Sequence, residues 1–174
     1  MISRLFFALG VLLGVVEPQA APDFAAKIFR TDDAIYFNAE LSGAYSQTAL
    51  ELALRGNRVA FRVLAELEGA TPSKTQITRS IRFDLSSKTW NVESHNGLEA
   101  KTVKNSQTAS EIASRIWGIR LGPIEHAANG ATITIVAQSG LLDDEGAWHP
   151  AGILWGYAEP KRTFVFRSAT EIPY

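Results

Sequence analysis

Hydrophobic positions recur every three to four residues in two short stretches of the chain, residues 46–55 and 106–115. The two stretches share the order Ser-Gln-Thr-Ala-x-Glu-x-Ala-x-Arg and differ at only three places. The helical spacing is clearest in the second stretch and continues two residues beyond it. The apolar residues there are Ala109, Ile112, Ala113, Ile116 and Trp117. The pattern predicts two helices, the second of which continues through Trp117.

The ends of both predicted helices carry recognisable signals. A Thr-x-x-Glu capping box begins at Thr48 and at Thr108, and the Ser two residues earlier is an alternative cap. Gly56 suits the left-handed position after a helix. The flanking sequences do not align, which favours shared cap chemistry over an internal duplication, although a small duplicated unit is the alternative.

Strand patterns fill the rest of the chain. Residues 58–68 alternate most clearly, with Val59, Phe61 and Val63 on one face and charges on the other. Two hairpins are expected, at 24–41 around Asp32-Asp33 and at 153–167. Shorter strand patterns occupy 77–85, 89–92, 98–103 and 132–138, and loops are expected at 122–130 and 140–150.

These elements predict one α+β domain over residues 21–174, mainly an antiparallel, sandwich-like sheet with two short amphipathic helices packed on it. Residues 1–20 have the layout of a secretory signal peptide, because Arg4 precedes the apolar run 5–16 and Ala20 offers a cleavage position. Pro18 is unfavourable near that position, so an uncleaved membrane anchor is the alternative. We therefore expect an exported bacterial protein located in the periplasm.

Composition removes several classes of function. The chain has no cysteine, which excludes disulfides, thiol catalysis and Cys-type zinc sites. Its formal net charge is −1, so no basic field indicates a nucleic-acid partner. No cofactor is predicted, and contact with a membrane is expected only through the N-terminal segment if it is uncleaved.

One group of residues has metal-ligand chemistry. It comprises His126, Asp143, Asp144 and His149, and two histidines with a carboxylate can hold zinc or iron. The spacing fits no HExxH motif and no EF-hand loop, which favours a solvated acidic loop over a metal site.

Three aromatic residues crowd the C-terminal third of the chain: Trp148, Trp155 and Tyr157. If exposed, such side chains would bind peptide, sugar or interfacial lipid. The alternative is ordinary core filling.

Four stretches follow the predicted signal peptide: residues 53–57, 59–63, 81–92 and 133–143. In the order of these stretches the chain resembles an exported bacterial family known as a domain of unknown function, number forty-three-ninety. The resemblance covers roughly residues 24–166. The chain departs from the family at 68–74, which is short and lacks the usual Trp- and Arg-rich segment. The resemblance implies an envelope location and assigns no catalytic residues.

Three hypotheses about function follow. The leading one is a non-catalytic periplasmic module that binds or helps to assemble an envelope component, with an envelope protein as the possible partner. The second is a metal-dependent hydrolase that uses His126, His149 and Asp143. The third is a carrier of a small molecule or lipid, with a cavity between sheet and helices.

Overall fold

Two antiparallel sheets and two helices make up the part of the chain that the structure, a computed structural model, describes: residues 20–95, 100–127 and 130–165. Sheet A has the strand order β1-β2-β7, and sheet B has the order β10-β8-β3-β4-β5-β6, with β9 paired to β8. The α+β class and the antiparallel sheets are therefore confirmed. The bounds of the sheet A strands are β1 Asp23–Arg30, β2 Ala34–Ser42 and β7 Arg115–Pro123. Those of sheet B are β3 Arg58–Glu68, β4 Ser73–Asp84, β5 Thr89–His95, β6 Lys101–Val103, β8 Thr132–Leu142, β9 Trp148–Pro150 and β10 Lys161–Val165.

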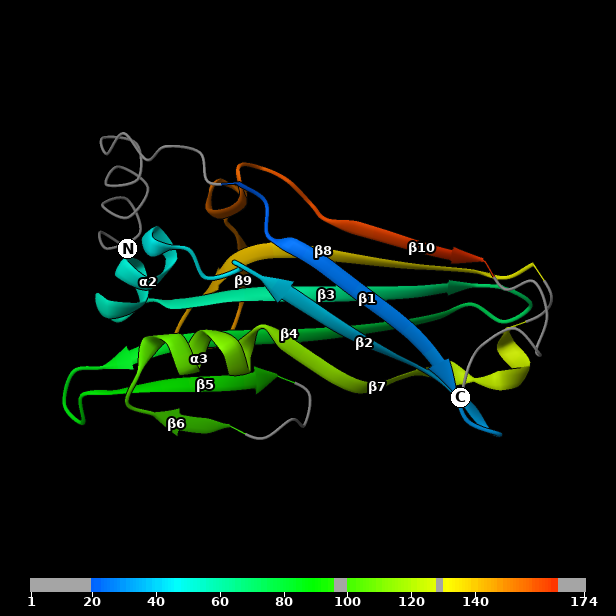
Figure 1. The fold of residues 1–174 in the computed structure, drawn as a ribbon, viewed down its shortest axis with the longest axis horizontal. Coiled ribbons are helices and arrows are strands. Elements are labelled where there is room, and N and C mark those ends of the chain that lie inside the picture. The colour runs from blue at the N-terminus through cyan, green and yellow to red at the C-terminus, as the bar shows by residue number, and fades with distance from the viewer. Residues whose placement is uncertain (1–19, 96–99, 128–129, 166–174) are drawn as a thin grey trace.

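The two helices and sheet A all lie on one face of sheet B. In Figure 1 the strands of sheet A cross obliquely over the long strands β3, β4 and β8, and helices α2 (Gln47–Leu54) and α3 (Ser106–Ala113) lie beside them. Two 3-10 turns, η1 (Ile124–His126) and η2 (Gly152–Trp155), complete the described elements. The outcome is a sandwich in which the covering layer is part sheet and part helix.

The core forms between the facing sides of the two sheets. Val59, Phe61 and Val63 of β3 are buried on that side, as the alternation of the sequence predicts. Phe24 of β1 and Phe37 of β2 face them from sheet A, and both are buried as well. Burial of these large apolar side chains supplies the main driving force for closing the sandwich.

Side chains of β4 join the two sheets at the edge of β7. The hydroxyl of Thr75 donates to the backbone carbonyl of Arg120 at 3.2 Å, and the guanidinium of Arg79 donates to the carbonyl of Arg115 at 3.5 Å. Burial lowers the pKa of Arg79. The phenol of Tyr45, whose pKa is raised by burial, donates to the carbonyl of Arg79 at 3.3 Å. The β7 edge is thus held by side chains from the opposite sheet.

Both helices are present, but their caps differ from the predicted capping boxes. Ser46, the alternative predicted for the first helix, accepts from the backbone N–H of Ala49, and Asn105 caps the second helix by accepting from the N–H groups of Gln107 and Thr108. Each helix buries two alanines, and Leu54 of α2 is 44% exposed, so α2 contacts the core along one side only. Gly56 has φ +86, as expected for a residue that follows a helix.

The prediction that the second helix runs through Trp117 is wrong. Helix α3 ends at Ala113, and Ile116 and Trp117 lie in strand β7, which the sequence analysis did not predict. Strand β7 pairs with β2, and two register shifts interrupt this pairing. The spacing of three residues between Ile116 and Ile119 looks helical because the bulge between them breaks the period of two.

The C-terminal third also differs from prediction. Residues 140–142 extend β8, and Trp148–Pro150 forms β9, so the expected loop at 140–150 is partly strand. Residues 152–155 form η2 instead of a strand, and β10 pairs with β8 instead of with 153–157. The strands predicted at 77–85, 89–92 and 98–103 correspond to β4, β5 and β6, which pair antiparallel in chain order. Residues 1–19 of the predicted signal peptide, residues 98–99 of the strand expected at 98–103 and residues 166–167 of the expected last hairpin lie outside the described residues.

Candidate functional site

The three aromatic residues predicted to bind a ligand do not form one exposed surface. Trp155 is 1% exposed and lies in the core, where its ring centroid is 6.3 Å from that of Phe61. Its indole Nε1 donates to the carbonyl of Ala44 at 3.0 Å. Trp155 therefore fills the core, which is the alternative that the sequence analysis left open.

Trp148 lies on the outer face of sheet B, where it is half-buried. The guanidinium of Arg62 stacks 4.6 Å from its ring centroid, and a Cβ on Gly140 would lie 2.4 Å from the ring. Arg62 also donates to Gln138, which donates to Glu159. This tight cover of Trp148 leaves its ring little surface for a ligand.

Tyr157 is the exposed member of the three, at 74%. It follows η2 with a positive φ of 62°, and its backbone N–H donates to the carbonyl of Gly152 at 2.7 Å. Its ring lies against Gly152. Tyr157 is thus an isolated aromatic side chain on a turn.

The predicted metal ligands are not brought together. Asp143 and His149 are in contact, with 3.0 Å between Oδ2 and Nε2, beside the β8–β9 end of sheet B. His126 lies on η1, where its Nδ1 is 2.9 Å from the hydroxyl of Ser73. Strand β8 runs for eleven residues between these two places, roughly 35 Å.

Asp143 makes hydrogen bonds to residues of the β8–β9 connection and of β9. The hydrogen bond from His149 and the backbone N–H of Ala147 lower the pKa of Asp143. Asp144, the remaining predicted ligand, is exposed in the same turn. Among the described residues, no group of three or more His, Asp or Glu side chains is placed to hold a metal ion. The three-residue set required by the hydrolase hypothesis is therefore not formed.

A different surface has the features of a binding site: the outer face of sheet A. Strand β7 carries an extra residue there, because Trp117 and Gly118 together lie opposite Asn38 of β2. Gly118 has φ +66, a conformation that glycine adopts without steric cost. Bulges of this kind redirect a side chain, and they occur often beside functional sites.

The bulge is fixed by one side chain. The carboxamide Oδ1 of Asn38 accepts a hydrogen bond from the backbone N–H of Gly118 at 2.7 Å. This bond uses the backbone N–H that the bulge removes from the regular ladder of hydrogen bonds. Trp117, directly before Gly118, is thereby held with its indole outside the sandwich, 53% exposed.

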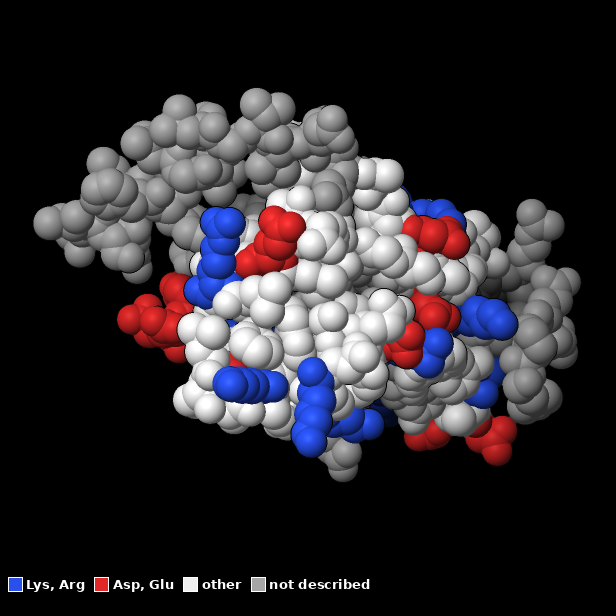
Figure 2. Space-filling model, turned by 60° about the vertical axis from the view of Figure 1, so that its left-hand side comes forward, with Lys and Arg blue, Asp and Glu red and all other residues white. Residues whose placement is uncertain are grey.

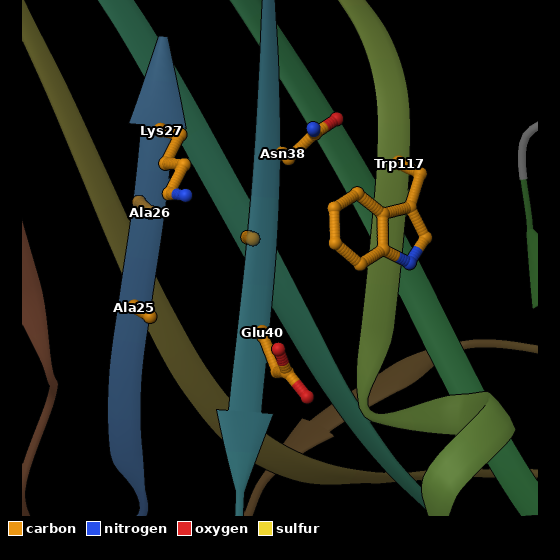
Figure 3. A pocket seen from close by; sticks show the side chains of 7 residues that line it. Ala25, Ala26, Lys27, Asn38, Glu40 and Trp117 are labelled. Carbon is orange, nitrogen blue, oxygen red and sulfur yellow. The ribbon is translucent and has the colours of Figure 1, made fainter.

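A shallow groove of about 120 Å³ lies in front of this indole. We call it the Trp117 groove; its lining residues are Ala25, Ala26, Lys27, Asn38, Ala39, Glu40 and Trp117. Figure 3 shows the indole reaching from β7 toward β2, between Asn38 and Glu40, with Lys27 on the next strand. Three strands therefore contribute one aromatic surface, two charged groups and an amide over a floor that includes alanine.

The surroundings of the Trp117 groove extend the same chemistry. The Arg115 Nε atom lies 3.2 Å from Glu40 Oε1 and holds that carboxylate at the rim. Further along sheet A, the rings of Phe29 and Tyr36 are stacked with centroids 5.5 Å apart. Both are half-buried and occupy neighbouring strands in register. The outer face of sheet A thus presents aromatic rings among separated charges.

The interior between sheet B and the helices is packed with side chains. The rings of Tyr45, Phe61 and Trp155 follow one another there, with centroids 5.8 and 6.3 Å apart. The groove residues, by contrast, belong to sheet A alone. Elsewhere, the face in Figure 2 shows acidic and basic side chains scattered around a broad uncharged area.

Comparison with known proteins found no matching family model, no matching curated protein and no matching solved structure. The resemblance to the exported family accordingly stays a prediction. Among the described helices, none is long and apolar enough to cross a membrane.

The Trp117 groove was not predicted from the sequence, because the hydrophobic pattern places Trp117 in a helix. A signal was available in the stretch Ile116-Trp117-Gly118-Ile119, since an isolated glycine within an apolar run is typical of a bulge. Lys27, Asn38 and Glu40 gave no separate signal, because alternating polar residues are normal on the solvent face of any strand.

Proposed function

We propose that this chain is an exported, non-catalytic module that binds a component of the bacterial cell envelope through the outer face of sheet A. The observation that carries the proposal is Trp117, a large aromatic side chain held outside the core by a dedicated bulge and the Asn38 hydrogen bond. Tryptophan is strongly enriched among residues that dominate binding energy, because it buries much area at little entropic cost. The export half rests on the signal-peptide pattern of residues 1–20.

A binding role accounts for the groove better than a catalytic one. Glu40 is the single carboxylate among its lining residues, and it is paired with Arg115. A general base must lie within hydrogen-bonding reach of the proton that it abstracts, whereas the Glu40 carboxylate is engaged by the Arg115 guanidinium. The groove supplies contact area and hydrogen-bonding groups, which suffice for recognition.

Mild cross-linking followed by affinity purification from an envelope fraction tests the binding half. The wild-type chain should recover the same component in repeated experiments, and Trp117→Ala should lose it. Tyr157→Ala is the matched control, because Tyr157 is also an exposed aromatic residue but lies outside the groove. Equal recovery by wild type and Trp117→Ala would reject the surface.

Cell fractionation tests the export half. A chain tagged at its C-terminus should be recovered with the periplasmic contents or with the inner membrane, according to whether the leader is cleaved. Recovery in the cytosol would reject export. The two halves are independent, because the binding surface does not depend on the location.

A further inference from the structure

We propose that the Trp117 groove seats one ring of a pyranose-based glycan chain. This inference rests on the proposed function and deepens it by naming the class of ligand. It follows from three features of the groove: the open indole surface, the mixture of donors and acceptors at the rim, and the small size of the hollow.

The first feature is the indole itself. A pyranose ring has a face of C–H bonds, which packs against the electron-rich face of an aromatic ring, while its hydroxyl groups point outward around the edge. Trp117 is 53% exposed and borders a floor that includes Ala25, so a flat ring has both an aromatic and an alanine surface to lie against. Indole is the largest aromatic surface that a protein can offer for such stacking.

The second feature is the chemistry of the rim. Lys27 supplies ammonium N–H donors, Glu40 supplies carboxylate acceptors, and the amide of Asn38 supplies two N–H donors while its oxygen is held by Gly118. A hydroxyl group both donates and accepts, so a polyhydroxylated ring can satisfy donors and acceptors together. A purely apolar ligand would cover the Lys27 ammonium and the Asn38 N–H groups without offering them an acceptor, which is costly.

The third feature is size. Sites that enclose a drug-sized molecule have volumes of roughly 300–1,000 Å³. The Trp117 groove has about 120 Å³ and opens along the sheet surface. It therefore fits one ring of a chain whose neighbouring units continue over the outer face of sheet A, where the Phe29–Tyr36 stack offers further aromatic surface.

The charges of the groove favour a glycan over the other polymers that use aromatic surfaces. Single-stranded nucleic acid stacks on aromatic rings in positively charged grooves, whereas this groove has one lysine and one glutamate in its lining and the whole chain has a net charge of −1. A protein interface would concentrate its apolar core, whereas Lys27, Asn38 and Glu40 surround Trp117 on the groove. A protein partner is the outcome that the test must separate.

Nuclear magnetic resonance of the ¹⁵N-labelled full chain tests the inference. The probes are the tetramer of β-1,4-linked N-acetylglucosamine and the tetramer of β-1,4-linked glucose. Trp117→Phe identifies the indole N–H signal of Trp117 among the four tryptophans. At least one probe should shift this signal, together with backbone signals of residues 25–27 and 38–40, in a saturable way. Trp117→Ala should weaken that binding by at least about tenfold.

Leu85→Ala is the control, because Leu85 is 69% exposed and lies outside the groove; it should leave the affinity unchanged. The absence of a saturable shift with both tetramers would overturn the inference, as would unchanged affinity in Trp117→Ala. If neither tetramer binds but cross-linking still recovers a protein through Trp117, the glycan inference fails while the proposed function stands.

Discussion

Asn38 and Gly118, 80 residues apart in the sequence, are joined by a hydrogen bond of 2.7 Å from the Gly118 backbone N–H to the Asn38 carboxamide oxygen. This contact replaces one ladder hydrogen bond between β2 and β7 at the bulge beside Trp117. One short polar side chain thereby sets the position of the most exposed tryptophan of the described residues.

Asn38→Ala should lower the free energy of unfolding by about 1 kcal/mol, because a single exposed hydrogen bond is lost. Urea denaturation measures this change. Acrylamide should also quench the fluorescence of Trp117 more readily, because its ring is less firmly held. Asn38→Asp keeps an acceptor oxygen at the same place and should retain most of the stability. Equal losses in the two variants would mean that the hydrogen bond does not fix the bulge.

Trp155→Phe should destabilise the protein strongly. The substitution removes the indole donor, leaves the buried carbonyl of Ala44 unsatisfied and opens space beside Phe61. The expected loss is about 2–4 kcal/mol in denaturant unfolding. Trp117→Phe is the control and should change stability by less than about 0.5 kcal/mol, because Trp117 is an exposed side chain. Similar effects of both substitutions would contradict the assignment of Trp155 to the core.

Asn105→Ala should cost about 1 kcal/mol of stability, because Asn105 caps α3 by accepting from two backbone N–H groups. Thr108→Ala should cost less than about 0.5 kcal/mol, although the sequence predicts a capping role for Thr108. Thermal or urea unfolding of the two variants decides between the caps. A larger loss in Thr108→Ala would restore the predicted capping box.

Gly140→Ala should destabilise the end of sheet B by about 1–3 kcal/mol, because the new methyl group would meet the ring of Trp148 and the carbonyl of His149. Removing the ring with Trp148→Ala in the same chain should recover part of that loss. The double variant should therefore cost less than the sum of the single variants in urea unfolding. Strict additivity would show that Trp148 does not pack on Gly140.

The stability of the β4–β5 turn should depend on acid pH through Asp84. Hydrogen bonds from the hydroxyl and backbone N–H groups of Ser86 and Ser87 lower the pKa of Asp84 to about 2. Because the pKa in the folded state is lower than in the unfolded state, this stabilisation is complete above the unfolded value of 3.8 and is lost as the pH falls through about 2.

Comparison with Asp84→Asn isolates this contribution. Unfolding midpoints measured from pH 5 to pH 2 should fall more steeply for the wild-type chain than for the variant, since asparagine does not titrate. Parallel curves for the two chains would show that Asp84 does not carry the predicted interaction.

The sequence predicts those elements whose local pattern agrees with their final environment. Strand β3 alternates without interruption because Phe61 and Val63 face the core while Arg62 faces outward. The two helices are predicted because Ala49 and Ala53, and the matching alanines of α3, repeat at helical spacing and are buried. In these segments one physical requirement, burial of one face, determines the sequence.

The errors occur where distant pairing overrides the local pattern. Ile116 and Ile119 are spaced as in a helix, yet β7 is extended because β2 is available to pair with it and bulges absorb the mismatch. The Trp117 groove shares this origin, because its residues come from three strands and meet only after that pairing. The cluster of aromatic residues at 148–157 did not identify a binding surface, because spacing in the sequence does not show which rings are buried. Trp155, for example, lies in the core.

The pairing of β2 with β7 and of β3 with β8 also bears on how the chain acquires its shape. Each sheet is complete only after segments about 80 residues apart in the sequence have paired. Such topologies fold slowly, because the entropic cost of closing a long loop comes before the contacts that offset it. A polypeptide that stays unfolded while it is being made suits passage through a translocation channel. For the export proposed above, the late pairing of β2 with β7 would keep the newly made chain extended enough to pass through such a channel.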